Sequence, residues 1–179
     1  MHQLRTFVLV SLGLLSMVAL VLCASEGKPP MTAPSAEPKP PEITWRSYED
    51  GLALAKKQDK HVLVNFTTSW CGYCKKMDKT TFADLEVIKM IEDEFVAVKV
   101  DGDSKRELDV NGYKVTESAL TKQEYHVQGY PTYWFLSPEA SKLGALRGYQ
   151  AKDQMMQALT FVAERKYDTT KADQKGQKN

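Results

Sequence analysis

Residues 61–75 read HVLVNFTTSWCGYCK, and this stretch decides the fold. Its first half, His61–Thr67, is a short apolar run of β-forming residues, which is typical of a buried central strand. Apolar residues at helical spacing then extend over Cys74–Glu94, with a break expected near Thr80-Thr81. A pair of cysteines therefore lies between a buried strand and a helix, at the carboxyl end of the strand, where α/β folds carry their sites.

The apolar pattern changes period repeatedly on both sides of this stretch. The segment over 101–121 is polar and gives no legible pattern. Besides the strand and helix just described, the sequence predicts a helix capped by Ser47, a strand over Phe95–Val100, a short helix over Glu117–His126, a strand over Thr132–Leu136, a turn over Ser137–Lys142, a strand over Gly144–Arg147 and a helix over Asp153–Lys166. This order predicts an α/β fold with a mixed central sheet flanked by helices on both faces.

Length and composition indicate one globular domain with appendages. The chain has 179 residues, of which 42% are hydrophobic and 26% charged. Its 24 lysines and arginines are balanced by 23 aspartates and glutamates, which argues against an electrostatic nucleic-acid binder. We expect a signal peptide or lipoprotein anchor over 1–25, a proline-rich linker over 26–42, the globular domain over 43–166 and a polar, flexible tail over 167–179.

The first residues have the shape of an export signal. One positive charge, Arg5, precedes an apolar run over 7–22, which is marginal for a permanent span because that takes roughly 20 apolar residues. Cys23 ends the run in a sequence similar to a bacterial lipoprotein box, although Leu22 stands where that box has a small residue. Lipidation of Cys23, conventional cleavage just beyond it and retention as a membrane anchor stay open. All three predict an exported, periplasmic protein that is either released or anchored to the membrane.

Cys71 and Cys74 have the spacing of a redox-active pair. At the N-terminus of a helix, free backbone N–H groups and the positive end of the dipole favour a thiolate on Cys71, and Lys75 adds positive charge. Because the thiolate attacks disulfide sulfur, Cys71 is the candidate nucleophile, and we expect it to be exposed. Cys74 lies three residues on, on the same helical face, and is the candidate resolving thiol, which we expect to be covered.

Three other uses of a cysteine pair compete with redox activity. A zinc site needs about four ligands, but the sequence has no second cysteine pair and only three histidines. Covalent haem attachment requires a histidine after the second cysteine, where Lys75 stands. A purely structural disulfide stays open, although so small a loop constrains the unfolded chain little. We therefore expect no metal, and no cofactor besides a redox-active disulfide between Cys71 and Cys74.

The segment from Ser47 to Lys166 resembles the thioredoxin-fold family, and in particular the exported thioredoxin-like thiol-disulfide oxidoreductases of bacteria. The matching motifs are Val62-Leu63-Val64-Asn65-Phe66, Trp70-Cys71-Gly72-Tyr73-Cys74-Lys75, Lys99-Val100-Asp101 and Gly129-Tyr130-Pro131-Thr132. The resemblance implies an active-site loop containing Trp70, Gly72 and Tyr73. It also implies a cis peptide bond before Pro131, in a loop that lies against the disulfide and binds an extended substrate through Tyr130, Pro131 and Thr132. Trp70, Tyr73 and Tyr130 are the expected apolar docking patch for a protein chain.

Asn65 departs from the family pattern. It stands where typical cytosolic thioredoxins have a buried aspartate thought to help proton transfer at the second cysteine, and an amide cannot titrate. Two interpretations stay open: Lys99, a water or the thiols themselves manage the proton, or Asn65 and Lys99 merely satisfy each other or adjacent backbone. The segment over 101–122 is longer than in the minimal fold, and it is either a tolerated surface insertion or a determinant of partner specificity.

These residues predict an extracytoplasmic thiol-disulfide oxidoreductase that acts on protein cysteines, with a reductase or isomerase favoured over an oxidase. In an oxidising periplasm such an enzyme needs electrons, so the resemblance implies a membrane thiol-reductant donor as partner. The alternative is a binding or scaffold module that keeps the fold and uses the pair as a structural bridge. His61 and His126 are expected at exposed or capping positions rather than in catalysis.

Overall fold

The computed structural model describes residues 40–110 and 112–168. The expectations for the segment over 1–25, for lipidation of Cys23 and for most of the linker and tail lie outside these residues. Within the described part of the chain, no helix is long and apolar enough to cross a membrane.

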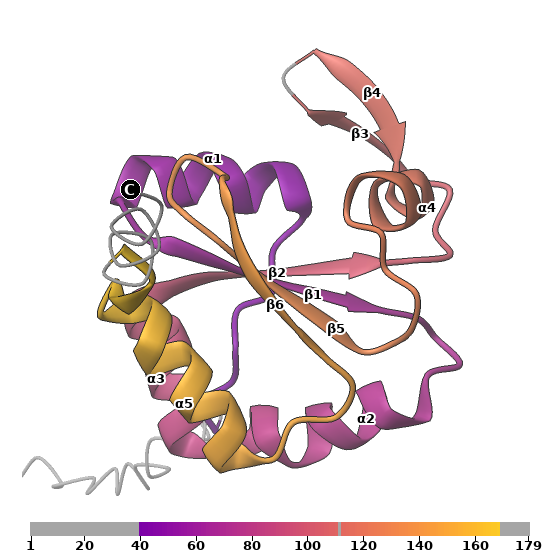
Figure 1. Cartoon of the computed structure of the whole chain (residues 1–179). Coiled ribbons are helices and arrows are strands. Elements are labelled where there is room, and N and C mark those ends of the chain that lie inside the picture. Colours follow the sequence, from indigo (N-terminus) through magenta and orange to yellow (C-terminus); the bar gives the residue numbers. More distant parts are fainter. Residues whose placement is uncertain (1–39, 111, 169–179) are drawn as a thin grey trace, which may run out of the picture. The chain divides into compact units, whose positions relative to one another are not determined.

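Figure 1 shows a central sheet with helices on both faces, as predicted. In chain order the elements are α1 (Tyr48–Gln58), β1 (His61–Thr67), α2 (Gly72–Lys79), the single turn η1 (Thr81–Ala83), α3 (Leu85–Glu94), β2 (Phe95–Asp101), β3 (Glu107–Val110), β4 (Tyr113–Thr116), α4 (Glu117–Ala119), the π-helical turn η2 (Leu120–Glu124), β5 (Thr132–Leu136), β6 (Lys142–Arg147) and α5 (Lys152–Ala163). The main sheet has the order β2-β1-β5-β6. It is mixed, because β1 runs parallel to β2 while β5 is antiparallel to both β1 and β6.

Strand β1 lies at the centre of the hydrophobic core. Six of its seven residues are buried, because β2 and β5 flank it within the sheet and helices cover both faces. Side chains alternate along the strand, so Val62, Val64 and Phe66 pack in the cluster that includes Tyr48 of α1, whereas Leu63 packs with residues of α2, α3 and α5. The loop that carries the cysteines therefore starts from the most constrained strand of the domain.

Capping interactions explain where the helices around the site begin. The hydroxyl oxygen of Ser47 accepts the backbone N–H of Asp50 at 3.2 Å and starts α1, as predicted. The expected break falls at Thr80, where α2 ends before η1. Asp84 then starts α3 by accepting backbone N–H groups of its first turn. The break separates α2, which carries the cysteines, from α3, which packs in the core.

The segment over 101–122 is a folded unit, although its sequence shows no legible pattern. It contains the hairpin β3–β4, and α4 with η2 takes the place of the single short helix expected over Glu117–His126. Its strands are four residues each, and only Leu108 and Val115 are buried in them. Two buried positions in so short a stretch are too few to reveal the alternation of buried and exposed residues that is typical of a strand. The sequence therefore did not predict the hairpin.

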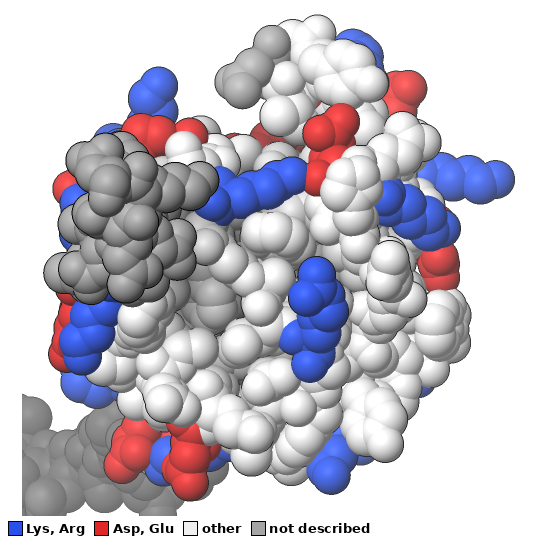
Figure 2. Space-filling view, in the orientation of Figure 1, with Lys and Arg blue, Asp and Glu red and all other residues white. Residues whose placement is uncertain are grey.

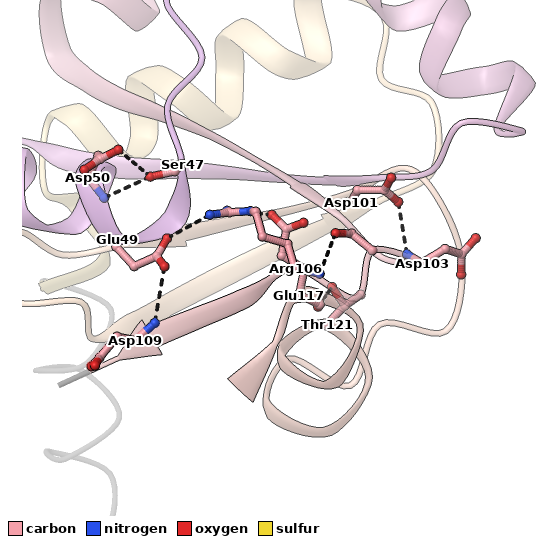
Figure 3. Close-up of polar contacts among 10 residues, drawn as sticks. Ser47, Glu49, Asp50, Asp101, Asp103, Arg106, Asp109, Glu117 and Thr121 are labelled. Atoms are coloured by element: carbon pink, nitrogen blue, oxygen red, sulfur yellow. Dashed lines mark hydrogen bonds and ion pairs between the residues drawn. The ribbon is translucent and has the colours of Figure 1, made fainter. Parts of the chain in front are cut away.

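Arg106 ties this hairpin to the rest of the domain, as Figure 3 shows. Its guanidinium lies 2.9 Å from the carboxylate of Glu117, which is buried, and 3.5 Å from that of Glu49 in α1. The other oxygen of Glu49 accepts the backbone N–H of Asp109 in β3 at 3.2 Å. One arginine and two carboxylates thus connect α1, β3 and α4.

The C-terminal end of the domain packs on the first residue of β1. His61 is buried, and its Nε2 lies 2.8 Å from the hydroxyl of Tyr167. The expectation that His61 is exposed or capping is therefore wrong, because the turn after α5 brings Tyr167 against its ring. His126 is exposed, as expected. The packed domain includes Tyr167, one residue past the expected boundary at Lys166.

We expect the stability of the domain to decrease on mild acidification through His61. Burial, followed by the charge of Arg165, lowers the pKa of His61, so the unfolded chain binds a proton more readily than the folded domain. The stabilising contribution is then complete above the unfolded pKa of about 6.5, and it is lost as the pH falls below that value. Urea unfolding across this range should show a falling free energy of unfolding in the parent and a flatter profile in His61→Gln.

The matched control is His126→Gln, which replaces an exposed histidine and should keep the parent's pH profile. Equal slopes in His61→Gln and the parent would contradict the assignment to His61.

Candidate active site

Cys71 and Cys74 form a disulfide at the start of α2. Cys71 occupies the N-cap position, as predicted, and its Sγ accepts the backbone N–H of Cys74 at 3.0 Å. The first turn of α2 carries no acidic side chain. The first sulfur therefore lies at the positive end of a helix and receives a backbone hydrogen bond, the setting that stabilises a thiolate once the disulfide is reduced.

The two cysteines are covered to the same degree in this oxidised form. Each has 4% of its surface exposed, so the expectation that Cys71 is exposed is wrong for the disulfide, whereas Cys74 is covered as expected. The reason is the ring itself, because its closure turns the Sγ of Cys71 back toward the first turn of α2. Gly72, between them, is exposed, and a Cβ added there would meet no atom within 4 Å.

Trp70 and Tyr73 are the exposed aromatic residues of the loop, at 67% and 63%. The indole N–H of Trp70 donates to the carboxylate of Asp103 at 2.7 Å, and its ring packs edge-to-face on Tyr130 with 5.8 Å between ring centres. The hydroxyl of Tyr130 lies so close to Gly102 that a Cβ there would be 2.0 Å from it. The first residues of the segment over 101–122 thus hold the side chains of Trp70 and Tyr130.

The loop before β5 has the predicted cis peptide bond between Tyr130 and Pro131. Thr132 is buried, and its hydroxyl donates to the carbonyl of Gly129 at 2.7 Å. The carbonyl of Pro131 accepts the N–H of Gly148, which has a positive φ of 78°. Since β5 pairs with β1 and begins at Thr132, this loop lies at the same edge of the sheet as the disulfide.

Asn65 and Lys99 do not satisfy each other. They are partners in the register of β1 and β2, but Lys99 forms an ion pair with Asp78 of α2 at 3.1 Å and lies 4.9 Å from the ring centre of Trp45. Asn65 is buried, and its Oδ1 has no hydrogen-bond partner within the described residues. The interpretation that these two side chains pair is therefore wrong. The carboxylate that Lys99 contacts belongs instead to Asp78 of α2.

A cavity of about 640 Å³ opens beside Cys74. Asp78 and Lys99 line it together with Thr68, whose buried hydroxyl also lacks a partner within the described residues. Sequence reasoning missed Asp78 and Thr68. The available signal was the position of Asp78 four residues after Cys74, which places both on one face of α2.

A second cavity, of about 480 Å³, lies between β6 and α5. Figure 2 shows that this face of the molecule carries few charged side chains. Its walls are apolar and amide side chains, and among the described lining residues Tyr167 is the titratable one. Charged side chains instead line the cavity beside Cys74.

The mixed sheet, the disulfide at a helix start and the cis-proline loop at the same edge define a thiol-disulfide site on a thioredoxin fold. A family model described as a thioredoxin-like domain matches residues 48–163. The chain belongs to this family, and the expected fold is confirmed.

Known proteins similar to this chain agree with that assignment. A thioredoxin from Thermus thermophilus superposes with a TM-score of 0.57 and 28% identity over 68% of this chain and 87% of its own. A protein disulfide-isomerase from Hordeum vulgare is 33% identical over 97 residues, which are 54% of this chain and 16% of that protein. The thiol:disulfide interchange protein DsbD from Colwellia psychrerythraea is 27% identical over 95 residues, 53% of this chain and 14% of that protein. The matched region spans about a sixth of the length of these two relatives.

We predict that Asp103 restrains the indole of Trp70. Asp103→Ala removes the acceptor of the indole N–H, so the exposed ring should move more freely and acrylamide should quench tryptophan fluorescence more strongly. In a Trp70→Phe background the same change should leave quenching unaltered. An equal increase in both backgrounds would show that Asp103 acts elsewhere.

Proposed function

We propose that this protein is an exported thiol-disulfide oxidoreductase that reduces or isomerises disulfides in other proteins. The observation that carries the proposal is the Cys71–Cys74 disulfide at the N-terminus of α2, next to exposed aromatic side chains and a cis-proline loop. Membership of the thioredoxin-like family and the likeness to a protein disulfide-isomerase support it.

In the forward reaction, the Cys71 thiolate attacks one sulfur of a substrate disulfide. The substrate's S–S bond breaks, a mixed disulfide forms at Cys71, and one substrate thiolate leaves. The Cys74 thiolate then attacks the sulfur of Cys71, which re-forms the internal disulfide and releases the second substrate thiolate. Two electrons pass from the protein dithiol to the substrate disulfide, and two protons follow.

The substrate is an extended, partly apolar protein segment. Trp70 and Tyr73, which flank the cysteine pair in sequence, present their rings to solvent, and Tyr130, which packs on Trp70, leads into the cis-proline loop. Burial and the nearby carboxylates of Asp103 and Asp101 raise the pKa of Tyr130, so its hydroxyl stays neutral at physiological pH. Aromatic rings with neutral polar tips suit a peptide better than a charged small molecule.

Export and tethering complete the proposal. The apolar run over 7–22 and Cys23 support a location outside the cytoplasm, with the domain either released into the periplasm or held at the membrane. Electrons for each cycle come from a thiol reductant in the membrane, because the periplasm is kept oxidising.

Trapping of mixed disulfides tests the exchange reaction. Cys74→Ser leaves Cys71 without its resolving thiol and should accumulate covalent, dithiothreitol-sensitive adducts with proteins that contain disulfides. Cys71→Ser should accumulate none, since it removes the sulfur that the N-terminus of α2 and the backbone N–H of Cys74 stabilise as a thiolate. Adducts are counted on non-reducing gels, with Cys23→Ser in every variant to remove the third thiol. If neither variant forms adducts, the pair is a structural bridge and the chain is a binding module.

The direction of exchange is tested by the reduction potential of the Cys71–Cys74 couple, equilibrated against glutathione and thioredoxin buffers. A reductase or isomerase should fall between about −270 and −180 mV, the values of thioredoxin and protein disulfide isomerase. A value near about −120 mV, typical of a strong periplasmic oxidant, would overturn the proposed direction.

A further inference from the structure

The resolving step requires a group that accepts the proton of the Cys74 thiol. Cys74 is buried and must lose its proton before it attacks Cys71, and an adjacent titratable group speeds such steps. Asn65 is buried on β1 beside Lys99 of β2, but its amide cannot accept a proton at physiological pH. The acceptor must therefore come from another element that reaches the surroundings of Cys74.

Three buried side-chain oxygens, on β1, on β5 and in the loop after β1, are candidates for binding water. The Oδ1 of Asn65, the Oγ1 of Thr68 and the hydroxyl of Tyr133 have no hydrogen-bond partner within the described residues. Asn65 and Tyr133 are directly paired in the register of β1 and β5, and Thr68 lines the cavity beside Cys74. Of these three residues, Thr68 is the one that lines the cavity, and a volume of about 640 Å³ has room for several ordered waters, which usually satisfy such a hydroxyl.

Asp78 is a carboxylate that lines the cavity beside Cys74. It lies four residues after Cys74 in α2, so the two side chains share a face with about 5–6 Å between their Cβ atoms. Both line the cavity, and burial, followed by the charge of Asp78, raises the pKa of Tyr133. Asp78 is half-exposed, so its carboxylate is in contact with both the cavity and bulk solvent.

The other charged groups around the cavity have different partners. Glu117 is buried against Arg106, which also pairs with Glu49. Asp101 accepts the backbone N–H of Asp103 in the turn after β2. Lys75 and Lys99 are cations, and Lys99 is the group that holds Asp78, at 3.1 Å. Of the described carboxylates that line the cavity, Asp78 is the one that lies on α2, the helix that carries Cys74.

We propose that Asp78 accepts, through water in this cavity, the proton that Cys74 loses in the resolving step, while Lys99 positions its carboxylate. The inference rests on the proposed exchange function and adds the proton path to it. The Cys74 thiol gives its proton to water as that water gives one to Asp78, and the resulting thiolate attacks the sulfur of Cys71. The released substrate thiolate takes up a proton from solvent, and Asp78 returns its own to solvent.

The experiment separates the two chemical steps with the aromatic disulfide reagent DTNB. The reduced full-length chain, with Cys23→Ser throughout, should release one coloured thiolate as Cys71 attacks and a second as Cys74 resolves the mixed disulfide. Stopped-flow absorbance gives both rates in the parent, in Asp78→Asn and in Asp78→Glu. The matched control is Asp93→Asn, which removes a charge from an exposed ion pair with Lys89 on α3.

We expect Asp78→Asn to slow the second release by about tenfold or more near neutral pH, with the first release within about twofold of the parent. The difference should shrink as the pH rises above about 9, since hydroxide then ionises the thiol directly. Asp78→Glu should recover most of the rate, and Asp93→Asn should match the parent.

Two results would overturn the proposal. One is an unchanged second release in Asp78→Asn, and the other is a slowing of the same size at every pH, which indicates a structural effect on α2. DTNB is a small disulfide, so the step is measured whether or not proteins are the substrates. Failure of the exchange function itself would appear in the adduct experiment instead.

Discussion

The hydrogen-bonded register of β1 between β2 and β5 is the constraint on which the site depends. It places Asn65 beside Lys99 on one side and beside Tyr133 on the other. A slip of one residue would turn these side chains to the opposite face of the sheet. Because β1 is buried on both faces, its apolar side chains oppose such a slip, and the loop with the cysteines starts from a fixed point.

The segment over 101–122 contacts residues of the site and helps to hold them in place. Gly102 leaves room for the hydroxyl of Tyr130, and Asp103 accepts the indole N–H of Trp70. Farther along the segment, Arg106 ties the hairpin to α1 and α4 through two carboxylates. Contacts to two aromatic residues beside the disulfide favour the interpretation of this segment as a determinant of specificity over that of a passive insertion.

Local signals in the sequence were sufficient for most of the sheet and for the cysteine pair. The apolar run over 61–67, the break at Thr80 and the N-cap position of Cys71 each follow from residues close together in the chain. The parts that were missed depend on distant packing. Lys99 meets a carboxylate 21 residues earlier in the chain, and His61 meets Tyr167 across 106 residues. No periodicity or motif encodes such pairs, because the fold brings them together only after the sheet and helices have assembled.

The position of the carboxylate of Asp78 on α2, rather than on β1 where Asn65 stands, has a physical rationale. A carboxylate on β1 would be desolvated among core residues, which costs several kcal/mol unless it is paired or neutralised. A carboxylate on α2 at the cavity mouth keeps half of its surface in water and has a cation 3.1 Å away, so that cost is largely avoided. The consequence is a longer path, because the proton must cross water to reach it. A carboxylate on the helix therefore avoids a cost in the core at the expense of direct contact with Cys74, and the hydroxyl of Thr68, which lines the cavity and has no partner within the described residues, is a polar group that such a water path can use.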